Sequence, residues 1–569
     1  MPPGAYVFVD FAKSFCRFDN LPASDMAAEG LVCRRAGTIV AVFHTTGQQK
    51  TAGLFSGAGS AGKEEYMSKW KTRMMAAFHA GAGTIVALMA VAWFSTAAAA
   101  LESGFDDKDI TYAIERDLSH EGVVSAHLVD IATNEGVVTL SGSVSNLLEK
   151  ERTVEIVRSI RGVRSIVDRI DVRPVERSDS EIRKDVTFAF VLDPVADSYE
   201  VDVAVDDGIV VLSGSVESWA EKNICTNVAK SVKGVRGVDN EIEVVYEGER
   251  SDAEIKTDVE RRLQLDPYVQ DELLEVQVND GVVKLKGTVG SLSEKAFART
   301  NALVLGAEEV DLDDVSIKFW ALDPAKRGAK VIIKSDDALE KAVQDALSFD
   351  PRVRVFDIDV GADAGVITLE GEVDNLRAVR AAVEDARRVV GVARVKNFLK
   401  VRMAEYPSDR EIEENAEYIL NWDPVIERYE IDVDVRNGMV YLYGIVDTRY
   451  EKEHAADCVS SAPGVVAVVN NLSVGSLAWR WKSDKEIRRS IENELRWSAY
   501  VDDENISVKV DDGTAILTGS ADTKHEYRAA VENAFDGGAK IVQARLKLNG
   551  RKDIETYYYR DTDRYDWWN

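Results

Sequence analysis

The chain has 569 residues and a formal net charge of −29, with 45% hydrophobic and 30% charged residues. It is too long for a single core and has the composition of a folded protein, so several globular domains are expected. The acidic excess argues against a nucleic-acid surface, and it leaves only local basic patches for contact with anionic membranes.

The N-terminal region is predicted to lie outside the folded domains. Residues 1–66 show no helical or strand periodicity, and we predict that they are not translated or are disordered. A basic segment begins at Met67, an apolar segment spans 84–94, and Ala98–Ala100 form a small-residue cleavage site. The sequence therefore predicts a secretory signal peptide at 67–100 and export to the periplasm. The alternative is an inner-membrane anchor through residues 74–101, with the rest of the chain periplasmic.

A turn glycine, an alternating strand and a second glycine six positions later recur six times in the remaining chain, for example in Asp207–Val216. An acidic or amide residue followed by Gly supplies the positive φ of a tight hairpin. The second glycine, Gly142 in the first copy, is interpreted as allowing the sheet to pack closely against a helix. The predicted turn glycines are Gly136, Gly208, Gly281, Gly365, Gly438 and Gly513.

Each copy also contains two predicted helices. Four copies open with a Ser-x-x-Glu capping box, as in Ser178–Glu181, followed by apolar residues at helical spacing. The first helix is expected to stop at an Asp-Pro dipeptide such as Asp193-Pro194, because proline disfavours helix in the residue before it. After the hairpin come a second amphipathic helix, a glycine and a third strand. The predicted unit is a small αββαβ sandwich of the α+β class.

The chain is thus predicted to be a tandem array of six such units, each a bead with its own core rather than part of a continuous stack. After the last strand, an aromatic and charged tail without periodicity is expected at 550–569. The predicted units are 104–174, 178–246, 251–320, 335–402, 408–475 and 483–549.

The repeated pattern of helix, D-P, D-G-x-V-x-L-x-G-x-V, helix, G-V and V-x-N strand resembles the BON domain, a family named for bacterial osmotically inducible and nodulation proteins. The resemblance covers roughly residues 106–548. It implies a protein that binds phospholipid or envelope surfaces, and the family includes periplasmic and lipoprotein members. This chain differs in having six units, a more acidic surface and no cysteine at which a lipid could be attached after the apolar segment.

The sequence offers no pattern that predicts an enzyme, a metal site or a cofactor. The four histidines after residue 100 lie in three different repeats without metal-ligand spacing, and they are interpreted as surface residues: His120, His127, His454 and His525. Cys225 and Cys458 lie on second helices and are interpreted as free thiols on the apolar face.

Two segments are candidates for lipid binding. The second helix of repeat 4 carries Arg377, Arg380, Arg387 and Arg388, which could contact anionic headgroups or simply complement the helix dipole. The linker Trp479-Arg480-Trp481 alternates aromatic and basic residues, which suits a membrane interface or packing between repeats 5 and 6. The expected function is multivalent, non-enzymatic binding of envelope phospholipid or envelope proteins. The alternative is a soluble osmotic or envelope-stress protein with a chaperone-like role and no direct lipid binding.

Overall fold

The structure is a computed structural model, which forms two compact units, Met1–Ala99 and Ala100–Asn569. The predicted signal peptide and the Trp479–Trp481 linker lie outside the described residues. Within the described part of the chain, no helix is both long and apolar enough to span a bilayer. The structure describes residues 31–35, 38–42, 105–121, 124–196, 201–246, 248, 250–328, 330, 335–403, 405–426, 431–475, 482–548 and 557–560.

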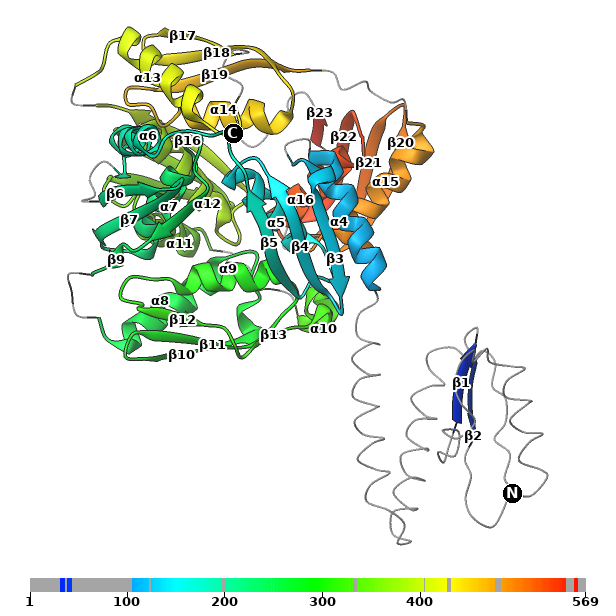
Figure 1. Cartoon of the computed structure of the whole chain (residues 1–569). Helices are drawn as coiled ribbons and strands as arrows, with labels where there is room; N and C mark the ends of the chain where they lie inside the picture. The colour runs from blue at the N-terminus through cyan, green and yellow to red at the C-terminus, as the bar shows by residue number, and fades with distance from the viewer. Residues whose placement is uncertain are drawn as a thin grey trace. The chain divides into compact units, whose positions relative to one another are not determined.

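In the first unit, β1 (Leu31–Arg35) and β2 (Thr38–Val42) form an antiparallel pair. The second unit contains the six predicted repeats, coloured in chain order in Figure 1. Repeat 1 comprises α4 (Asp107–Glu121), β3 (Val129–Asn134), β4 (Val137–Val144), α5 (Leu147–Ser159) and β5 (Ser165–Val172). Repeat 2 comprises α6 (Asp179–Leu192), β6 (Val201–Asp206), β7 (Ile209–Val216), α7 (Trp219–Lys230), β8 (Gly237–Asn240) and β9 (Glu243–Val244).

Repeat 3 comprises α8 (Asp252–Leu265), β10 (Leu274–Asn279), β11 (Val282–Val289), α9 (Leu292–Ala302), β12 (Glu309–Asp311) and β13 (Val315–Ile317), and the short helix α10 (Pro324–Arg327) follows it. Repeat 4 comprises α11 (Asp336–Phe349), β14 (Ile358–Asp363), β15 (Val366–Val373), α12 (Leu376–Arg388) and β16 (Arg394–Val401).

Repeat 5 comprises α13 (Asp409–Trp422), β17 (Ile431–Arg436), β18 (Met439–Val446), α14 (Arg449–Val459) and β19 (Ala467–Val474). Repeat 6 comprises α15 (Asp484–Trp497), β20 (Ile506–Asp511), β21 (Thr514–Ala521), α16 (Lys524–Asp536), β22 (Ile541–Leu548) and β23 (Tyr557–Arg560). The last strand corrects the sequence expectation, because part of the predicted aperiodic tail pairs antiparallel with β22.

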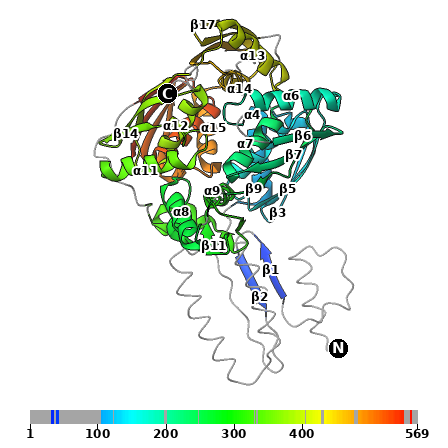
Figure 2. The same cartoon turned by 90° about the vertical axis from the view of Figure 1, so that its left-hand side faces the viewer.

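Every repeat has the predicted αββαβ order. The first two strands are antiparallel, and the third is parallel to the second, so the second helix is a crossover connection. Figures 1 and 2 show the arrangement in repeat 5, where α13 and α14 lie on the same side of the sheet. The four predicted capping boxes are present, and helices α6, α8, α11 and α13 each end immediately before the Asp of an Asp-Pro dipeptide.

Each hairpin turn is held by an aspartate whose role was not evident from the sequence. Asp409, the first residue of α13, accepts hydrogen bonds of 2.9 Å from the backbone N–H groups of both Asn437 and Gly438. The five other repeats repeat this contact. A carboxylate that receives two backbone N–H groups fixes the turn against the start of the first helix. The equivalent aspartates are Asp107, Asp179, Asp252, Asp336 and Asp484.

The turn glycines have positive φ as predicted, but the interpretation of the second glycine was wrong. A Cβ at Gly142 would lie 2.1 Å from the carbonyl oxygen of Leu128, the last residue of the short 3₁₀ helix Ala126–Leu128 that leads into β3, and neither α-helix of the repeat makes this contact. Gly519 stands in the same relation to Asn505, at 1.9 Å. Both glycines also have a φ beyond 100°, which residues with a side chain rarely adopt. Glycine is therefore needed where the backbone that enters the first strand approaches the second strand, not where the sheet packs against an α-helix.

Repeats 1, 3, 4 and 6 each close their own core as predicted, but the beads are not independent, because repeats also contribute to one another's cores in pairs. Buried residues of repeats 2 and 5 form one continuous apolar cluster. Trp497 of repeat 6 belongs to the core of repeat 1, and Leu265 of repeat 3 belongs to the core of repeat 4. The pairs are therefore 1 with 6, 2 with 5 and 3 with 4. The sheets remain separate, since strands pair only within a repeat among the residues described.

Candidate functional site

A cavity of about 380 Å³ lies where repeats 2, 4 and 5 meet. Its walls come from α6 and α7 of repeat 2, α12 of repeat 4, and α13 and α14 of repeat 5. The lining combines apolar side chains such as Ile224 and Ile419 with charged ones from all three repeats. A partly apolar pocket with converging polar groups has the features of a small-ligand site.

Three residues of repeat 5 bring different donor atoms together in the wall of this cavity. His454 Nε2 lies 2.7 Å from Asp423 Oδ2, and Cys458 Sγ lies 3.3 Å from the same oxygen. The sulfur is 3.5 Å from His454 Nε2. His454 and Cys458 are four residues apart on α14, and Asp423 caps the end of α13, so the two helices of one repeat build the cluster.

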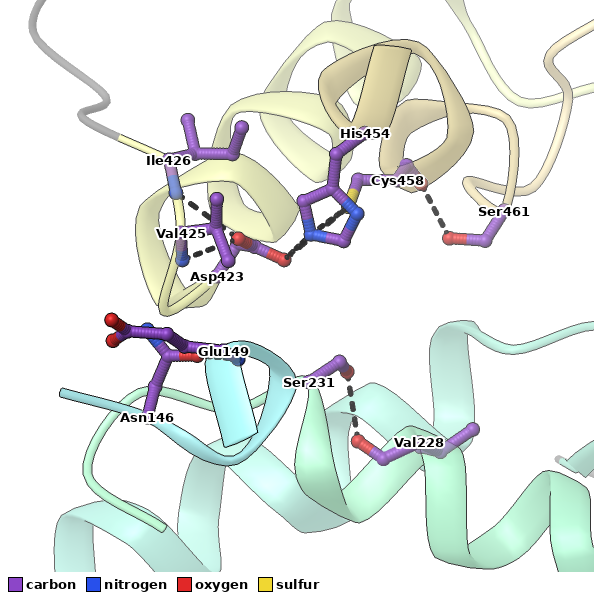
Figure 3. A network of polar contacts seen from close by, with 10 residues as sticks. All are labelled: Asn146, Glu149, Val228, Ser231, Asp423, Val425, Ile426, His454, Cys458 and Ser461. Carbon is purple, nitrogen blue, oxygen red and sulfur yellow. Dashed lines mark hydrogen bonds and ion pairs between the residues drawn. The ribbon is translucent and has the colours of Figure 1, made fainter. Parts of the chain in front are cut away.

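Both carboxylate oxygens of Asp423 have hydrogen-bond partners. Its Oδ1 accepts backbone hydrogen bonds from Val425 at 2.8 Å and Ile426 at 3.1 Å, which leaves Oδ2 facing α14 (Figure 3). The ring of Tyr450 stacks on His454, with centroids 5.4 Å apart and planes 18° apart. The cluster is therefore preorganised by contacts outside it.

This geometry does not support a cysteine nucleophile. In a Cys-His-Asp relay, the two imidazole nitrogens contact different partners, whereas here Nε2 contacts both the thiol and the carboxylate. Burial, with Asp423 adding to it, also raises the pKa of Cys458 to about 11, so the reactive thiolate is scarce at neutral pH. Burial opposes protonation of His454, but Cys458 and Asp423 outweigh it and hold the His454 pKa well above its usual range.

The interpretation of these residues from sequence was therefore partly wrong. Cys225 is a buried free thiol, as predicted, and His127 is exposed. Cys458 instead contacts charged and polar partners, and both His454 and His525 are partly buried. The spacing of four residues between His454 and Cys458 was the available signal. It could not show that Asp423, thirty-one residues earlier than His454, completes the group.

Two of the predicted lipid-binding arginines line the same cavity. Arg377 forms an ion pair with Asp193 of repeat 2, and Arg380 forms one with Asp457 of repeat 5. Asp193 is almost fully buried, so its pairing with Arg377 compensates a carboxylate that has lost its hydration. These two arginines thus join α12 to the neighbouring repeats.

The other two arginines lie at the end of α12. Arg387 is half-buried, and burial together with nearby Arg528 lowers its pKa to about 10. Arg388 is exposed and pairs with Glu384 on its own helix. The four side chains therefore do not gather on one solvent face, and their role in lipid binding stays a prediction.

A different basic surface of repeat 4 does face solvent. Alternate residues of the edge strand β16, namely Arg394, Lys396, Phe398 and Lys400, are exposed and lie on one side of the sheet. Phe398 is 57% exposed between the cations. Within the described part of the chain, no ion pair engages these three basic residues. We call this set the β16 stripe.

Repeat 6 has exposed Arg545 and Lys547 at two of the corresponding positions, whereas repeats 2 and 5 have no counterpart of the β16 stripe. The neighbours of the β16 stripe on β15 include Glu370 opposite Phe398, and Glu372, which pairs with Arg402 beyond the end of the strand. In repeat 2 the register places Gly237, Asp239, Glu241 and Glu243 at the corresponding positions. In repeat 5 they are Ala467, Val469, Asn471 and Ser473.

Comparison with known proteins agrees with this architecture. The family model for the BON domain matches residues 106–174, 178–246, 251–311, 335–403, 408–476 and 483–550. The chain is similar to osmotically-inducible protein Y of Escherichia coli (strain K12), with 29% identity over 144 residues, which cover 24% of this chain and 72% of that protein.

Two solved structures of CdsD, a structural protein of the type III secretion system of Chlamydia trachomatis, also match, one of them its C-terminal domain. They are 15% and 17% identical and cover 37% and 40% of this chain and all of each solved chain. Their TM-scores are both 0.11, too low to support any argument. The family matches extend over most of the sequence and coincide with the six αββαβ repeats, so the chain belongs to the BON domain family, with six BON domains.

Proposed function

We propose that this protein is an exported, non-enzymatic binding protein of the periplasm that contacts anionic phospholipid through the β16 stripe. The observation that carries the proposal is the position of three exposed cations around an exposed Phe398 on one face of an edge strand. Cations near an anionic bilayer contribute about 1 kcal/mol each, and an aromatic ring between them can enter the interface.

The rest of the chain explains why the contact is local. With a net charge of −29, the protein as a whole is repelled by an anionic surface. Only a place where the local charge is reversed can approach within a Debye length of the lipid. The β16 stripe meets this condition more fully than α12, since Arg377 and Arg380 already serve buried or bridging carboxylates.

Liposome co-sedimentation of the full chain tests the proposal, with neutral and anionic vesicles at low and high salt. Replacing Arg394, Lys396 and Lys400 by Gln is expected to weaken binding to anionic vesicles by about two orders of magnitude at low salt. A matched control removes the same charge from exposed arginines of other repeats, Arg236, Arg410 and Arg488. Equal loss in both variants would reduce the effect to net charge and contradict the proposed surface.

The earlier candidates belong in the same experiment. Replacing Trp479 and Trp481 by Ala is expected to weaken binding in a salt-insensitive way, because indole rings favour the headgroup region whatever the lipid charge. Replacing Arg377, Arg380, Arg387 and Arg388 by Gln is expected to weaken binding in a salt-sensitive way if α12 takes part. Loss of folding in that variant, seen by circular dichroism, would instead show that Arg377 and Arg380 are needed for the structure.

A second candidate function is chaperone-like binding of envelope proteins. It is favoured by Tyr443 and Ile445 on the outer face of β18, which are 40% and 62% exposed, and by the stacking of Tyr441 on Tyr443. Exposed apolar groups on a sheet suit an unfolded polypeptide. A parent protein that binds no vesicle, yet suppresses aggregation of a denatured envelope protein, would establish this function in place of lipid binding.

A further inference from the structure

We infer that Asp423, His454 and Cys458 form a binding site for one borderline-soft divalent cation, with zinc the best fit. The three potential ligand atoms, a carboxylate oxygen, an imidazole nitrogen and a sulfur, all lie within 4.8 Å of one another. Zinc takes this donor set in proteins. This inference goes beyond the proposed lipid contact, which involves a different repeat.

The distances between the donor atoms fit tetrahedral coordination. Zinc bonds of 2.0–2.3 Å place neighbouring ligand atoms about 3.3–3.8 Å apart in a tetrahedron. The separations of Cys458 Sγ from Asp423 Oδ2 and from His454 Nε2 are 3.3 and 3.5 Å. Only the 2.7 Å separation between Nε2 and Oδ2 must widen, by roughly 0.6 Å, which a small rotation of either side chain provides.

The surroundings supply what a metal site needs beyond its ligands. Asp423 Oδ1 is fixed by the Val425 and Ile426 backbone N–H groups, and the His454 ring is stacked on Tyr450. Such outer contacts orient ligands and strengthen metal binding. The adjoining cavity of about 380 Å³ leaves room for a water molecule in the fourth position. Figure 3 shows His454 and Cys458 directed from α14 towards the Asp423 carboxylate.

The other repeats show that the fold itself does not require this group. Asp193 and Asp266 occupy the position of Asp423, and in the same turn Asp193 accepts two backbone hydrogen bonds and Asp266 accepts one. The positions of His454 and Cys458 are taken by Ile224 and Val228 in repeat 2, by Phe297 and Asn301 in repeat 3, and by Ala381 and Asp385 in repeat 4. Among the described residues, only repeat 5 combines a thiol, an imidazole and a carboxylate close enough to bind a metal together.

Metal binding has a defined proton balance. The ligands are the Cys458 thiolate, neutral His454 and the Asp423 carboxylate, so the thiol proton and the imidazolium proton of His454 are both released to solvent when the cation enters. Calcium and magnesium prefer oxygen ligands and are expected to bind poorly. No step beyond binding is implied.

The test uses the full chain without an affinity tag, stripped of metal with a chelator and titrated with Co²⁺ and Zn²⁺. We expect one equivalent of Co²⁺ to produce a thiolate-to-cobalt charge-transfer band, with visible bands of the intensity typical of tetrahedral coordination. Zn²⁺ should displace the cobalt, and it should raise the melting temperature of the parent protein. The absence of a charge-transfer band from the parent protein would overturn the inference without any mutation.

Matched variants locate the site. C458A and H454Q are expected to lower Zn²⁺ affinity by about 100-fold or more, measured by competition with a chelating dye. C225A removes a buried thiol elsewhere, and H127Q removes an exposed histidine, so both should bind like the parent. A charge-transfer band that persists in C458A would overturn the assignment to repeat 5, and so would one lost in C225A.

Discussion

The backbone N–H of Lys233, just after α7 in repeat 2, donates a 2.6 Å hydrogen bond to the carbonyl oxygen of Trp422, the last residue of α13 in repeat 5. Corresponding bonds occur in the two other pairs, from Arg161 to Trp497 at 2.9 Å and from Val390 to Leu265 at 3.0 Å. In each pair, one repeat donates a hydrogen bond to a carbonyl group at the end of its partner's first helix, which has no donor within that helix.

The donor is always the residue before the glycine that follows the second helix. In repeat 5 this residue is Pro463, which has no N–H, so repeat 5 can only be the acceptor in this contact. The pairing is nested along the chain, the first repeat with the sixth and the second with the fifth. We therefore expect unfolding to be coupled between paired repeats rather than between all neighbours.

W422A tests this coupling. Trp422 is buried in the core shared by repeats 2 and 5, so its truncation should cost about 3–5 kcal/mol. Hydrogen exchange followed by mass spectrometry should show lost protection in both repeats, while repeats 1 and 6 keep theirs. Loss of protection confined to repeat 5 would support independent repeats.

The same measurement applies to G438V. This change should lower the free energy of unfolding by on the order of 1–3 kcal/mol through strain in the turn.

G519A is expected to destabilise repeat 6 by about 2–4 kcal/mol. The added Cβ would lie 1.9 Å from the Asn505 carbonyl oxygen, and φ at this position is 135°. G361A is the control, because its Cβ would meet nothing within 4 Å and its φ is not positive. Chemical denaturation of both variants should separate them clearly, and a neutral G519A would refute the argument from strand approach.

A364N is expected to stabilise repeat 4 by about 0.5–1 kcal/mol. Ala364 has a φ of 49° in its hairpin turn, a conformation that asparagine tolerates better than alanine. Asn437 occupies the same position in repeat 5 with a φ of 51°. The reciprocal change N437A should destabilise repeat 5 by a similar amount. If the two changes had the same sign in urea unfolding, backbone preference would not explain them.

H525Q should make the protein less sensitive to acid. Burial, followed by Arg528 and Arg388, lowers the pKa of His525 to about 3. Below its ordinary pKa of 6.5 the unfolded chain therefore takes up a proton that the folded chain does not, so stability falls as pH falls from 6.5 towards 3. Between pH 7 and pH 4.5 this proton uptake should lower the free energy of unfolding of the parent by about 2–3 kcal/mol, and H525Q should lack this decrease.

The free energy of unfolding at these two pH values checks the prediction, with H127Q as an exposed control. Glu526 acts in the opposite direction, since burial raises its pKa to about 7 and stability from this group is lost as pH rises from 4.5 through 7. It is present in all three proteins, so it cancels in the comparison. Parallel curves for the parent and H525Q would contradict the assignment to His525.

The sequence alone determined the repeat unit, because its signals are local. The capping box at Ser178, the Asp-Pro stop at Asp193 and the turn at Gly208 each act within a few residues, and all three were confirmed. The aspartate that holds each turn was missed, since Asp409 and Gly438 are twenty-nine residues apart and no local rule connects them.

Only the tertiary structure decided how the repeats meet and where the candidate sites lie. The basic character of repeat 4 was visible in the sequence, but packing turned Arg377 towards Asp193 and left Lys396 in solvent. His454 and Cys458 were visible as well, yet their partner Asp423 comes from the other helix of the repeat. Periodicity specifies which face of an element is apolar, whereas the identity of the surface that covers it depends on contacts between residues far apart in the chain.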